Sequence, residues 1–242
     1  MEGTPARLHR RWLQRWVQAG LDFLYPPRCA GCGAMGPDWC EACQTGLRRL
    51  RGPLCPRCGA PRLGPRSCAA CRTLELPLTV RSYARYEGAL ARAILHLKYR
   101  PNPRLAARMA GWLAELCGRE TWRPSLVVPV PLSKERRRRR GYNQMDLVAK
   151  ALAGLLGLPC KTDALSRVRD TRSQVGLDAV ARHRNVQDAF QARREAVQGS
   201  VILLVDDLFT TGATLAACAA ALREAGSGEV YALTVGRAAS GF

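Results

Sequence analysis

The sequence VILLVDDLFTTGAT, residues Val201–Thr214, decides the fold because its character changes twice over a short distance. The continuous apolar run predicts a buried strand over Val201–Asp206. Two acids and a turn follow, and the pattern then predicts a helix over Ala213–Ala225. A strand that carries polar residues at its carboxyl end and leads into a helix is typical of open α/β sheets, which bind ligands at that end.

The turn has the composition of an anion site. Backbone N–H groups at the start of a helix point toward a common centre and attract phosphate. Gly212 allows close approach of the backbone, and threonine hydroxyls add donors. Two carboxylates would repel a phosphate, so we expect Asp206 and Asp207 to face ribose hydroxyls or Mg²⁺. The alternative is an ordinary capped helix after a core strand, which does not require paired acids followed by paired threonines.

The surrounding sequence alternates between helical and strand patterns. Apolar spacing predicts helices over about 87–99, 103–118 and 142–156. Further strands are predicted over Leu126–Pro131, near 160–166 and over Val230–Val235. This alternation indicates a doubly wound, mostly parallel sheet.

Residues 29–71 contain four Cys-x-x-Cys pairs and no periodicity long enough to build an apolar core. Each pair suits a knuckle in which two thiolates converge on one metal ion, and two knuckles complete a tetrahedral zinc site. The pattern predicts two structural zinc ions, and sequential and crossed pairing of the knuckles are both open. Disulfides and a thioredoxin-like redox motif are the alternatives, although a redox pair is usually single. The expected ligands are Cys29, Cys32, Cys40, Cys43, Cys55, Cys58, Cys68 and Cys71.

The chain is strongly basic. Its 38 basic residues, 34 of them arginine, exceed the acids enough to give a net charge of +19. This balance favours nucleic acid, an anionic membrane surface or phosphorylated substrates as partners. A loop after the strand at Leu126–Pro131 is expected to contact pyrophosphate or a DNA backbone, the alternative being a solvated loop or the start of a helix. Its candidate residues are Ser133, Lys134, Arg136, Arg137, Arg138, Arg139 and Arg140.

Two further segments have open interpretations. Tyr142 follows the arginine run and either stacks on a base or packs on the next helix. The polar stretch 168–190, which begins with Arg169, is either a mobile hood over the site or a surface hairpin. We group Arg169 with the residues expected to contact pyrophosphate or DNA.

The first 26 residues are expected to form a basic amphipathic helix over about 5–25, ended by Pro26-Pro27. Packing on its own protein is favoured over contact with a membrane surface or a partner. No run approaches the roughly 18 apolar residues needed to cross a bilayer. We therefore expect a cytoplasmic protein without a transmembrane segment, with peripheral contact at the inner face of the membrane as an alternative.

The segment Val201–Thr214 resembles the phosphoribosyl pyrophosphate motif of type I phosphoribosyltransferases. The resemblance implies a phosphoribosyltransferase-like fold in which Asp206 and Asp207 contact ribose hydroxyls. It implies that the 5′-phosphate lies in the turn formed by Thr210, Thr211, Gly212, Ala213 and Thr214. Bound phosphoribosyl pyrophosphate would bring Mg²⁺ with it.

The order of segments is similar to that of ComF proteins, over about residues 25–240. The Cys-x-x-Cys block is followed by VVPVPLSKERRRRRGYNQ (127–144), RDTRSQVGLDAVARHRNVQDAF (169–190) and the phosphate loop. The resemblance implies a small N-terminal zinc-ribbon module over 27–76, after the helix in 1–26, and a phosphoribosyltransferase-like domain over 77–242.

The function implied by this resemblance is handling of incoming single-stranded DNA in natural transformation, with a pocket for phosphoribosyl pyrophosphate or a nucleotide. Other DNA-uptake proteins would then be partners. Two alternatives are open: an active phosphoribosyltransferase that acts on an unidentified base, and a zinc-dependent scaffold with a relic pocket. The sequence assigns no catalytic residue.

Overall fold

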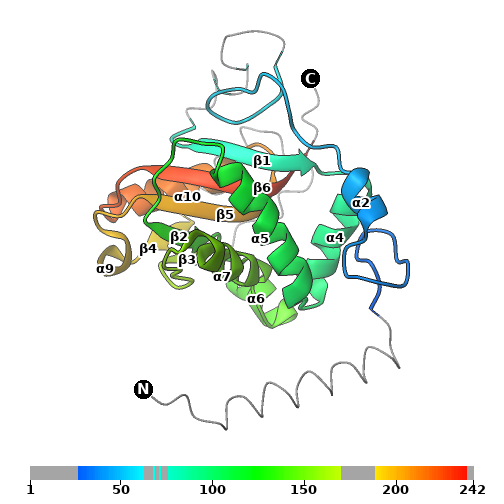
Figure 1. Cartoon of the computed structure of the whole chain (residues 1–242). Helices are drawn as coiled ribbons and strands as arrows, with labels where there is room; N and C mark the ends of the chain where they lie inside the picture. The colour runs from blue at the N-terminus through cyan, green and yellow to red at the C-terminus, as the bar shows by residue number, and fades with distance from the viewer. Residues whose placement is uncertain (1–26, 63–67, 69–70, 72–75, 170–188, 239–242) are drawn as a thin grey trace, which may run out of the picture.

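The computed structural model describes residues 27–62, 68, 71, 76–169 and 189–238. The helix expected over 5–25 and most of the stretch 168–190 lie outside these residues. In the described part, strands and helices alternate along the chain around one main sheet (Figure 1).

The main sheet has four parallel strands in the order β1-β6-β5-β2. The central strands β5 and β6 are buried along most of their length, which explains the continuous apolar runs that predicted them. The bounds are β1 (Thr79–Arg85), β2 (Leu126–Pro129), β5 (Ile202–Phe209) and β6 (Val230–Arg237). All carboxyl ends therefore lie at one end of the sheet, where Figure 1 shows the arrowhead of β1 beside α4 (Gly88–Tyr99).

Helices cover both faces of the sheet, so the doubly wound α/β class is confirmed. Leu203 and Val205 of β5 contribute to a core shared with α4, α5 (Pro103–Cys117) and α7 (Gln144–Leu156). Ile202 and Leu204, which point to the other face, join a core with α10 (Ala213–Glu224). A small antiparallel pair, β3 (Leu165–Arg167) and β4 (Phe190–Ala192), and the short helix α9 (Arg194–Val197) flank the α10 side.

Two local expectations were wrong. The arginine run, expected mainly in a loop, forms the helix α6 (Lys134–Arg140). The Ser133 side chain accepts a hydrogen bond from the Arg136 amide and begins the helix, while Gly141 ends it at φ +78°. The strand expected near 160–166 is shorter and later, because Cys160 makes only an isolated bridge with Val127.

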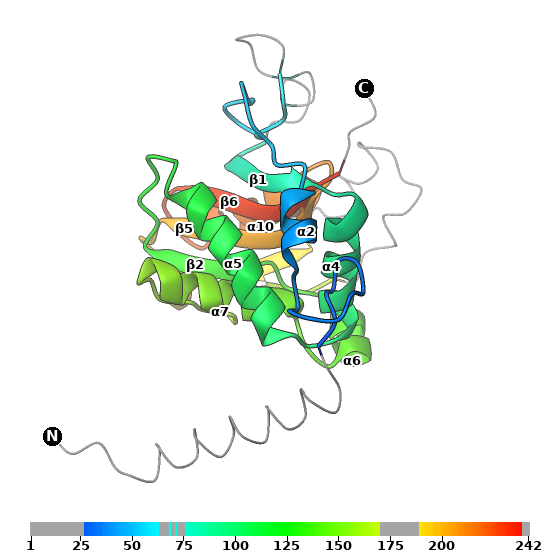
Figure 2. The ribbon, with the colours of Figure 1, turned by 45° about the vertical axis from the view of Figure 1, so that its right-hand side comes forward.

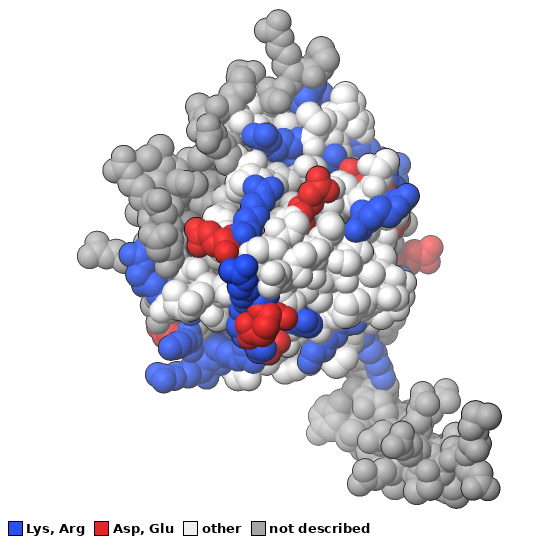
Figure 3. Space-filling model, turned by 90° about the vertical axis from the view of Figure 1, so that its left-hand side faces the viewer, with Lys and Arg blue, Asp and Glu red and all other residues white. Residues whose placement is uncertain are grey.

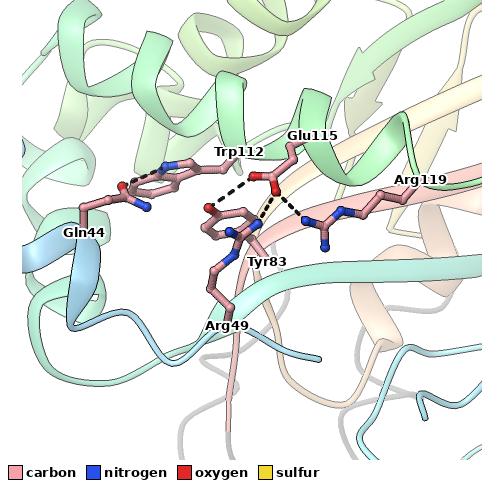
Figure 4. A network of polar contacts seen from close by, with 6 residues as sticks. All are labelled: Gln44, Arg49, Tyr83, Trp112, Glu115 and Arg119. Atoms are coloured by element: carbon pink, nitrogen blue, oxygen red, sulfur yellow. Dashed lines mark hydrogen bonds and ion pairs between the residues drawn. The ribbon is translucent and has the colours of Figure 1, made fainter. Parts of the chain in front are cut away.

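The first cysteine pairs dock on the α4 and α5 side through aromatic and polar contacts. The short helix α2 (Glu41–Thr45) lies against α4 and α5 in Figure 2. Gln44 Oε1 accepts a hydrogen bond from Trp39 Nε1 at 2.9 Å. It also accepts one from Trp112 Nε1 at 3.2 Å (Figure 4). Trp112 stacks on Tyr83 of β1 with 5.2 Å between ring centroids. The module therefore shares a core with the sheet domain.

An ion cluster closes the edge of this contact. Glu115 on α5 accepts from Arg49 and Arg119, and Tyr83 Oη donates to it at 3.4 Å (Figure 4). The Arg49 guanidinium also lies 4.6 Å from the centroid of the Tyr83 ring. These hydrogen bonds, with that from Arg49 the main cause, hold the pKa of Glu115 below its ordinary value. The charged form of Glu115 is thus part of the docked arrangement.

Candidate functional site

The acidic pair lies in the last part of β5, on opposite faces of the strand. The strand is longer than the sequence predicted and includes both acids and Phe209. Asp207 follows Leu203 and Val205 on the side of α4 and α7 and is buried, at 8% exposure. Asp206 lies on the α10 side, and its Oδ1 accepts a hydrogen bond from the Asp207 amide at 2.8 Å.

The Asp207 carboxylate is held by two residues from different helices. Lys98 Nζ, at the end of α4, lies 3.1 Å from its Oδ1. Gln144 Nε2, at the start of α7, donates to its Oδ2 at 2.7 Å. Gln144 Oε1 in turn accepts from Arg140 Nη1 at 3.0 Å. This chain, Lys98–Asp207–Gln144–Arg140, fixes the orientation of Asp207 and joins the acidic pair to the arginine helix.

The sequence did not identify Lys98 or the contact of Gln144 with Asp207 as part of the site. Gln144 stood in the segment RGYNQ, which was singled out for its resemblance only. The sequence offered only Asn143, a common first residue of a helix, as a signal here; that Gln144 is buried, at 3% exposure, is known from the structure alone. Buried amides require hydrogen-bond partners, and a neighbouring carboxylate is one such partner.

Asp206 ionises less readily than an ordinary aspartate. Burial and the charge of Asp207 raise its pKa from 3.8 to about 7, while the Asp207 amide and Lys98 act in the opposite direction. The two acids therefore differ in environment: Asp207 has a cation and an amide donor, whereas no ion pair joins Asp206 to a cation among the described residues.

The turn after the pair is shaped by Gly212. This residue has φ +85°, and a Cβ there would lie 3.0 Å from Leu76 Cδ1 and from the Phe209 ring. It is the N-cap of α10 and has no side chain to occupy the first amides. Glycine is the residue that adopts this conformation without strain.

Most amides of this turn are free. Within the described part of the chain, the Ala213 amide has one long contact, 3.4 Å to Thr211 Oγ1. The amides of Thr210, Thr211, Gly212 and Thr214 have no hydrogen-bond partner among the described residues. Unpaired N–H groups at the start of a helix can donate hydrogen bonds to a bound anion.

The arginine helix α6 follows β2 at the same end of the sheet. Residues 134–139 are exposed, whereas Arg140 is half-buried with its guanidinium 5.4 Å from the centroid of the Tyr99 ring. Arg137 Nη2 lies 3.9 Å from Asp146 Oδ2. Ser133 is buried as the cap, so its hydroxyl is engaged in the helix start. Arg169 is exposed, and the rest of the expected hood lies outside the described residues.

Tyr142 packs on the protein, but its contact is with α4 and not with the next helix along the chain, as the alternative expected. It is half-buried between α6 and α7, and its hydroxyl donates to the Leu97 carbonyl. Burial is the main cause that raises the pKa of Tyr142 above its ordinary value. Its ring is therefore committed to the contact with α4.

The eight cysteines form two separate clusters in sequential pairing. In each cluster the four Sγ atoms lie within 4.8 Å of one another. The Sγ–Sγ distances are 3.6 Å for Cys29–Cys43, 3.7 Å for Cys32–Cys40, 3.8 Å for Cys55–Cys71 and 3.4 Å for Cys58–Cys68. Zinc with bonds of about 2.3 Å to four tetrahedral sulfurs requires sulfur atoms about 3.8 Å apart, so both clusters fit the ion.

Backbone amides favour thiolates in both clusters. Burial opposes ionisation of Cys29, but amides of Cys40, Cys32 and Gly31 outweigh it and lower the pKa to about 6. The Gly31 and Cys40 amides both lie 3.4 Å from Cys29 Sγ. Amides of Cys68, Cys58 and Arg57 similarly lower the pKa of Cys55 to about 6 against burial. Burial instead raises the pKa of Cys43, Cys58 and Cys71, so the fit to structural zinc rests on the geometry of the four sulfurs in each cluster.

The second cluster is connected to the phosphate loop. Arg237, at the end of β6, donates from Nη1 to the Cys58 carbonyl at 2.7 Å, and its Nη2 lies 3.6 Å from Cys58 Sγ. Its guanidinium lies 4.2 Å from the centroid of the Phe209 ring. The Phe209 ring in turn borders Gly212. A buried cation thus connects the metal cluster and the turn.

No helix among the described residues combines the length and the apolar character needed to cross a membrane.

The end of the sheet opposite the acidic pair, where α9 lies, has acidic side chains among the basic ones (Figure 3). Arg193, for example, pairs with Asp163 and with Glu195.

Comparison with protein families gives a match over residues 20–73, which span all eight cysteines of the clusters, to the family described as "Double zinc ribbon domain". Among solved structures, the glutamine phosphoribosylpyrophosphate amidotransferase of B. subtilis is 21% identical, with a TM-score of 0.40 over 58% of this chain and 30% of that protein. A phosphoribosyltransferase of Corynebacterium diphtheriae is 24% identical, with a TM-score of 0.38 over 69% of this chain and 79% of that protein.

Curated relatives extend over most of the chain. The "DNA utilization protein YhgH" of Salmonella typhimurium is 35% identical over 198 residues, which are 79% of this chain and 86% of that protein. The "Competence protein ComFC" of Bacillus subtilis is 27% identical over 77% of this chain and 78% of that protein. The "Competence protein F" of Haemophilus influenzae is 37% identical over 48% of this chain and 51% of that protein.

Proposed function

This chain belongs to the ComF family, and from that premise we propose that it handles incoming single-stranded DNA during natural transformation, in the cytoplasm. Its relatives are named for DNA utilization and for competence, which supports a role in DNA uptake. We further propose that the carboxyl end of the sheet binds phosphoribosyl pyrophosphate or a related nucleotide. Other DNA-uptake proteins are its expected partners.

One observation carries the nucleotide proposal: an acidic pair at the end of a buried strand leads directly into a turn in which most amides are free among the described residues. The amides of Thr210–Thr214 would bind the 5′-phosphate, with Gly212 allowing the close approach. The carboxylates of Asp206 and Asp207 would accept hydrogen bonds from ribose hydroxyls. Anion and diol would thus be recognised by adjacent residues of one strand and turn.

Mg²⁺ suits this donor set, because hard cations prefer carboxylate oxygens. Lys98 already pairs with Asp207 Oδ1 at 3.1 Å. The ion and its pyrophosphate would therefore approach on the Asp206 side, or Lys98 would move from the carboxylate to the pyrophosphate. In either arrangement Lys98 supplies a positive charge near the acidic pair.

DNA contact is assigned to the arginine helix. Arg136, Arg137, Arg138 and Arg139 are exposed on α6, and guanidinium groups bind phosphate oxygens in a fork geometry. Arg169 and Lys134 are expected to extend this surface. We propose that zinc has a structural role in residues 27–76 and that residues 77–242 form the nucleotide-binding domain.

The nucleotide proposal is tested by calorimetric titration of phosphoribosyl pyrophosphate with Mg²⁺ into the zinc-loaded chain. The variant Asp206→Ala/Asp207→Ala should lose binding while its circular dichroism is unchanged. Asp163→Ala, which removes an exposed carboxylate at the other end of the sheet, is the matched control and should bind normally. Equal affinity in all three proteins would reject the pocket.

The DNA proposal is tested by binding of a single-stranded oligonucleotide across a salt series. Arg138→Gln/Arg139→Gln should reduce the slope of log affinity against log salt by about 0.7 for each arginine that contacts a phosphate. Arg194→Gln/Arg223→Gln removes two equally exposed arginines at the opposite end of the sheet and should leave the slope unchanged. Equal slopes in the two variants would reject α6 as the contact.

Active glycosyl transfer is the second candidate. Displacement of pyrophosphate from the anomeric carbon needs positioning and charge stabilisation more than a dedicated protein base, and Lys98 provides a cation beside the acidic pair. Release of pyrophosphate with one member of a panel of nucleobases would establish the transferase. Binding without release would leave the pocket as a nucleotide-binding site.

A further inference from the structure

Tyr99 is a large aromatic side chain that the fold does not use. It is the last residue of α4 and is 62% exposed. Within the described residues its hydroxyl has no hydrogen-bond partner. Tyr83 and Tyr142, by contrast, each place the hydroxyl against an acceptor and the ring against neighbours. The ring of Tyr99 therefore presents apolar surface to solvent without a structural reason.

The surroundings of this ring are cationic and ordered. The Arg140 guanidinium lies 5.4 Å from the ring centroid, a cation–π distance. Arg140 is itself fixed by its hydrogen bond to the buried Gln144. Beyond it, the exposed arginines of α6 continue away from the ring. An aromatic ring thus borders the start of a row of phosphate-binding groups.

The residue before Tyr99 reaches the acidic pair. Lys98, the residue before Tyr99, reaches Asp207, so the end of α4 contacts both the proposed nucleotide pocket and the arginine helix. Lys98 and Arg140 are the two ends of the chain of polar contacts that passes through Asp207 and Gln144. Tyr99 consequently lies where a polynucleotide bound to α6 would come closest to the pocket.

We propose that Tyr99 is a stacking platform for a nucleobase of single-stranded nucleic acid whose phosphates are bound by the arginines of α6. This inference rests on the proposed handling of DNA and adds to it the residue that distinguishes a single strand from a duplex. In a duplex both faces of each base are covered by neighbouring bases, whereas a single strand offers free faces. Every base has such a face, so stacking tolerates any sequence.

Charge complementarity favours this occupant over a protein partner. A protein that covered Tyr99 would also have to neutralise Lys134 and the four exposed arginines, while α6 itself contributes one acid, Glu135. A polynucleotide supplies a negative charge at every residue together with an aromatic base. Both features of the surface are therefore satisfied by one ligand.

The test compares two fluorescent probes of equal length, a thymidine oligonucleotide and an abasic deoxyribose-phosphate oligomer, by anisotropy with the zinc-loaded full chain. The wild type should bind the thymidine probe about tenfold more tightly, which is within the effect usual for one stacked base. Tyr99→Leu, which keeps apolar volume but removes the ring, should bind the two probes equally. Tyr99→Phe should retain the preference.

The arginine variant distinguishes the stacking platform at Tyr99 from the proposed handling of DNA as a whole. Arg138→Gln/Arg139→Gln should weaken binding of both probes by the same factor and keep the preference for bases. Persistence of the preference in Tyr99→Leu, or its absence in the wild type, would overturn the platform while leaving DNA binding in place. Failure of the wild type to bind either probe would overturn the platform together with the proposed handling of DNA.

Discussion

Arg237 Nη1 donates a hydrogen bond of 2.7 Å to the backbone carbonyl of Cys58. The two residues lie at opposite ends of the described chain, one at the end of β6 and the other in the second cysteine cluster. The same guanidinium, 6% exposed, lies over the Phe209 ring and close to Cys58 Sγ. One buried cation therefore holds together a metal cluster, a strand end and the start of the phosphate loop.

Replacement of Arg237 should lower the stability of the folded protein. Arg237→Met keeps apolar volume but leaves the Cys58 carbonyl without its donor and the anionic thiolate cluster without its counter-charge. We expect the free energy of unfolding in urea to fall by about 2–4 kcal/mol. Arg223→Met, at an exposed position of α10, should change it by less than about 0.5 kcal/mol. Similar unfolding curves for both variants would contradict a structural role of Arg237.

The two clusters should hold two zinc ions and should be separable. Cys32→Ser and Cys68→Ser each remove one ligand from a different cluster, so each purified variant should contain one zinc ion per chain by mass spectrometry of the metal. Cys68→Ser should also weaken binding of phosphoribosyl pyrophosphate, because its cluster touches Arg237 and the loop. Loss of both ions from either single variant would show that the clusters do not fold independently.

Ionisation of Asp206 should lower the free energy of unfolding, so stability should depend on pH. The pKa of Asp206 is raised from 3.8 to about 7 by burial and by Asp207. The folded state therefore binds this proton more tightly than the unfolded state, and stability falls as pH rises from about 4 to about 7. Asp206→Asn cannot ionise, so it should be more stable than the wild type at pH 8, by on the order of 1–3 kcal/mol.

At pH 4 the difference between Asp206→Asn and the wild type should nearly disappear, because both side chains are then neutral. Asp163→Asn, at an exposed position, is the control and should change stability by less than about 0.5 kcal/mol at either pH. Thermal unfolding at the two pH values measures both variants. A wild type that is the more stable protein at pH 8 would show that Asp206 is compensated by partners other than those described.

The sequence predicted those elements whose signal is local. The apolar run of β5 and the periodicity of α4, α5 and α7 each lie within one segment, and the structure has them close to the expected bounds. Strand β1 was missed because Arg81 and Ser82 interrupt its apolar pattern. Their partners are distant in sequence: Arg81 Nε donates to Glu120 at 2.7 Å, and Thr234 Oγ1 donates to Ser82 at 2.7 Å.

For the candidate site, residue types were more predictable than contacts. The acids, the turn and the eight cysteines follow from motifs with fixed spacing, whereas the sequence left the pairing of the cysteines open and the structure shows it to be sequential. The arginine run was read by its charge, although Ser133 and Gly141 are ordinary signals for the start and end of a helix. The contacts of Lys98 and Gln144 with Asp207 depend on the packing of α4 and α7 against β5, which no local pattern encodes.

Gly212 gives the sharpest test of the phosphate loop. In Gly212→Ala a Cβ would be added at φ +85° and would lie 3.0 Å from Leu76 and from the Phe209 ring. The left-handed conformation costs about 1–2 kcal/mol for a residue with a side chain, and the close contacts add to this. We expect lower stability and, because the turn must shift, at least a tenfold loss of affinity for phosphoribosyl pyrophosphate.

The matched control is Gly154→Ala in α7, where an added Cβ meets nothing within 4 Å. Alanine is preferred to glycine inside a helix by about 1 kcal/mol, so this variant should be slightly more stable and should bind the ligand normally. Calorimetry and thermal unfolding of both variants give the comparison. If Gly212→Ala lost stability but kept its affinity, the free amides of the turn would not be the phosphate site, and the acidic pair would have to recognise its ligand without them.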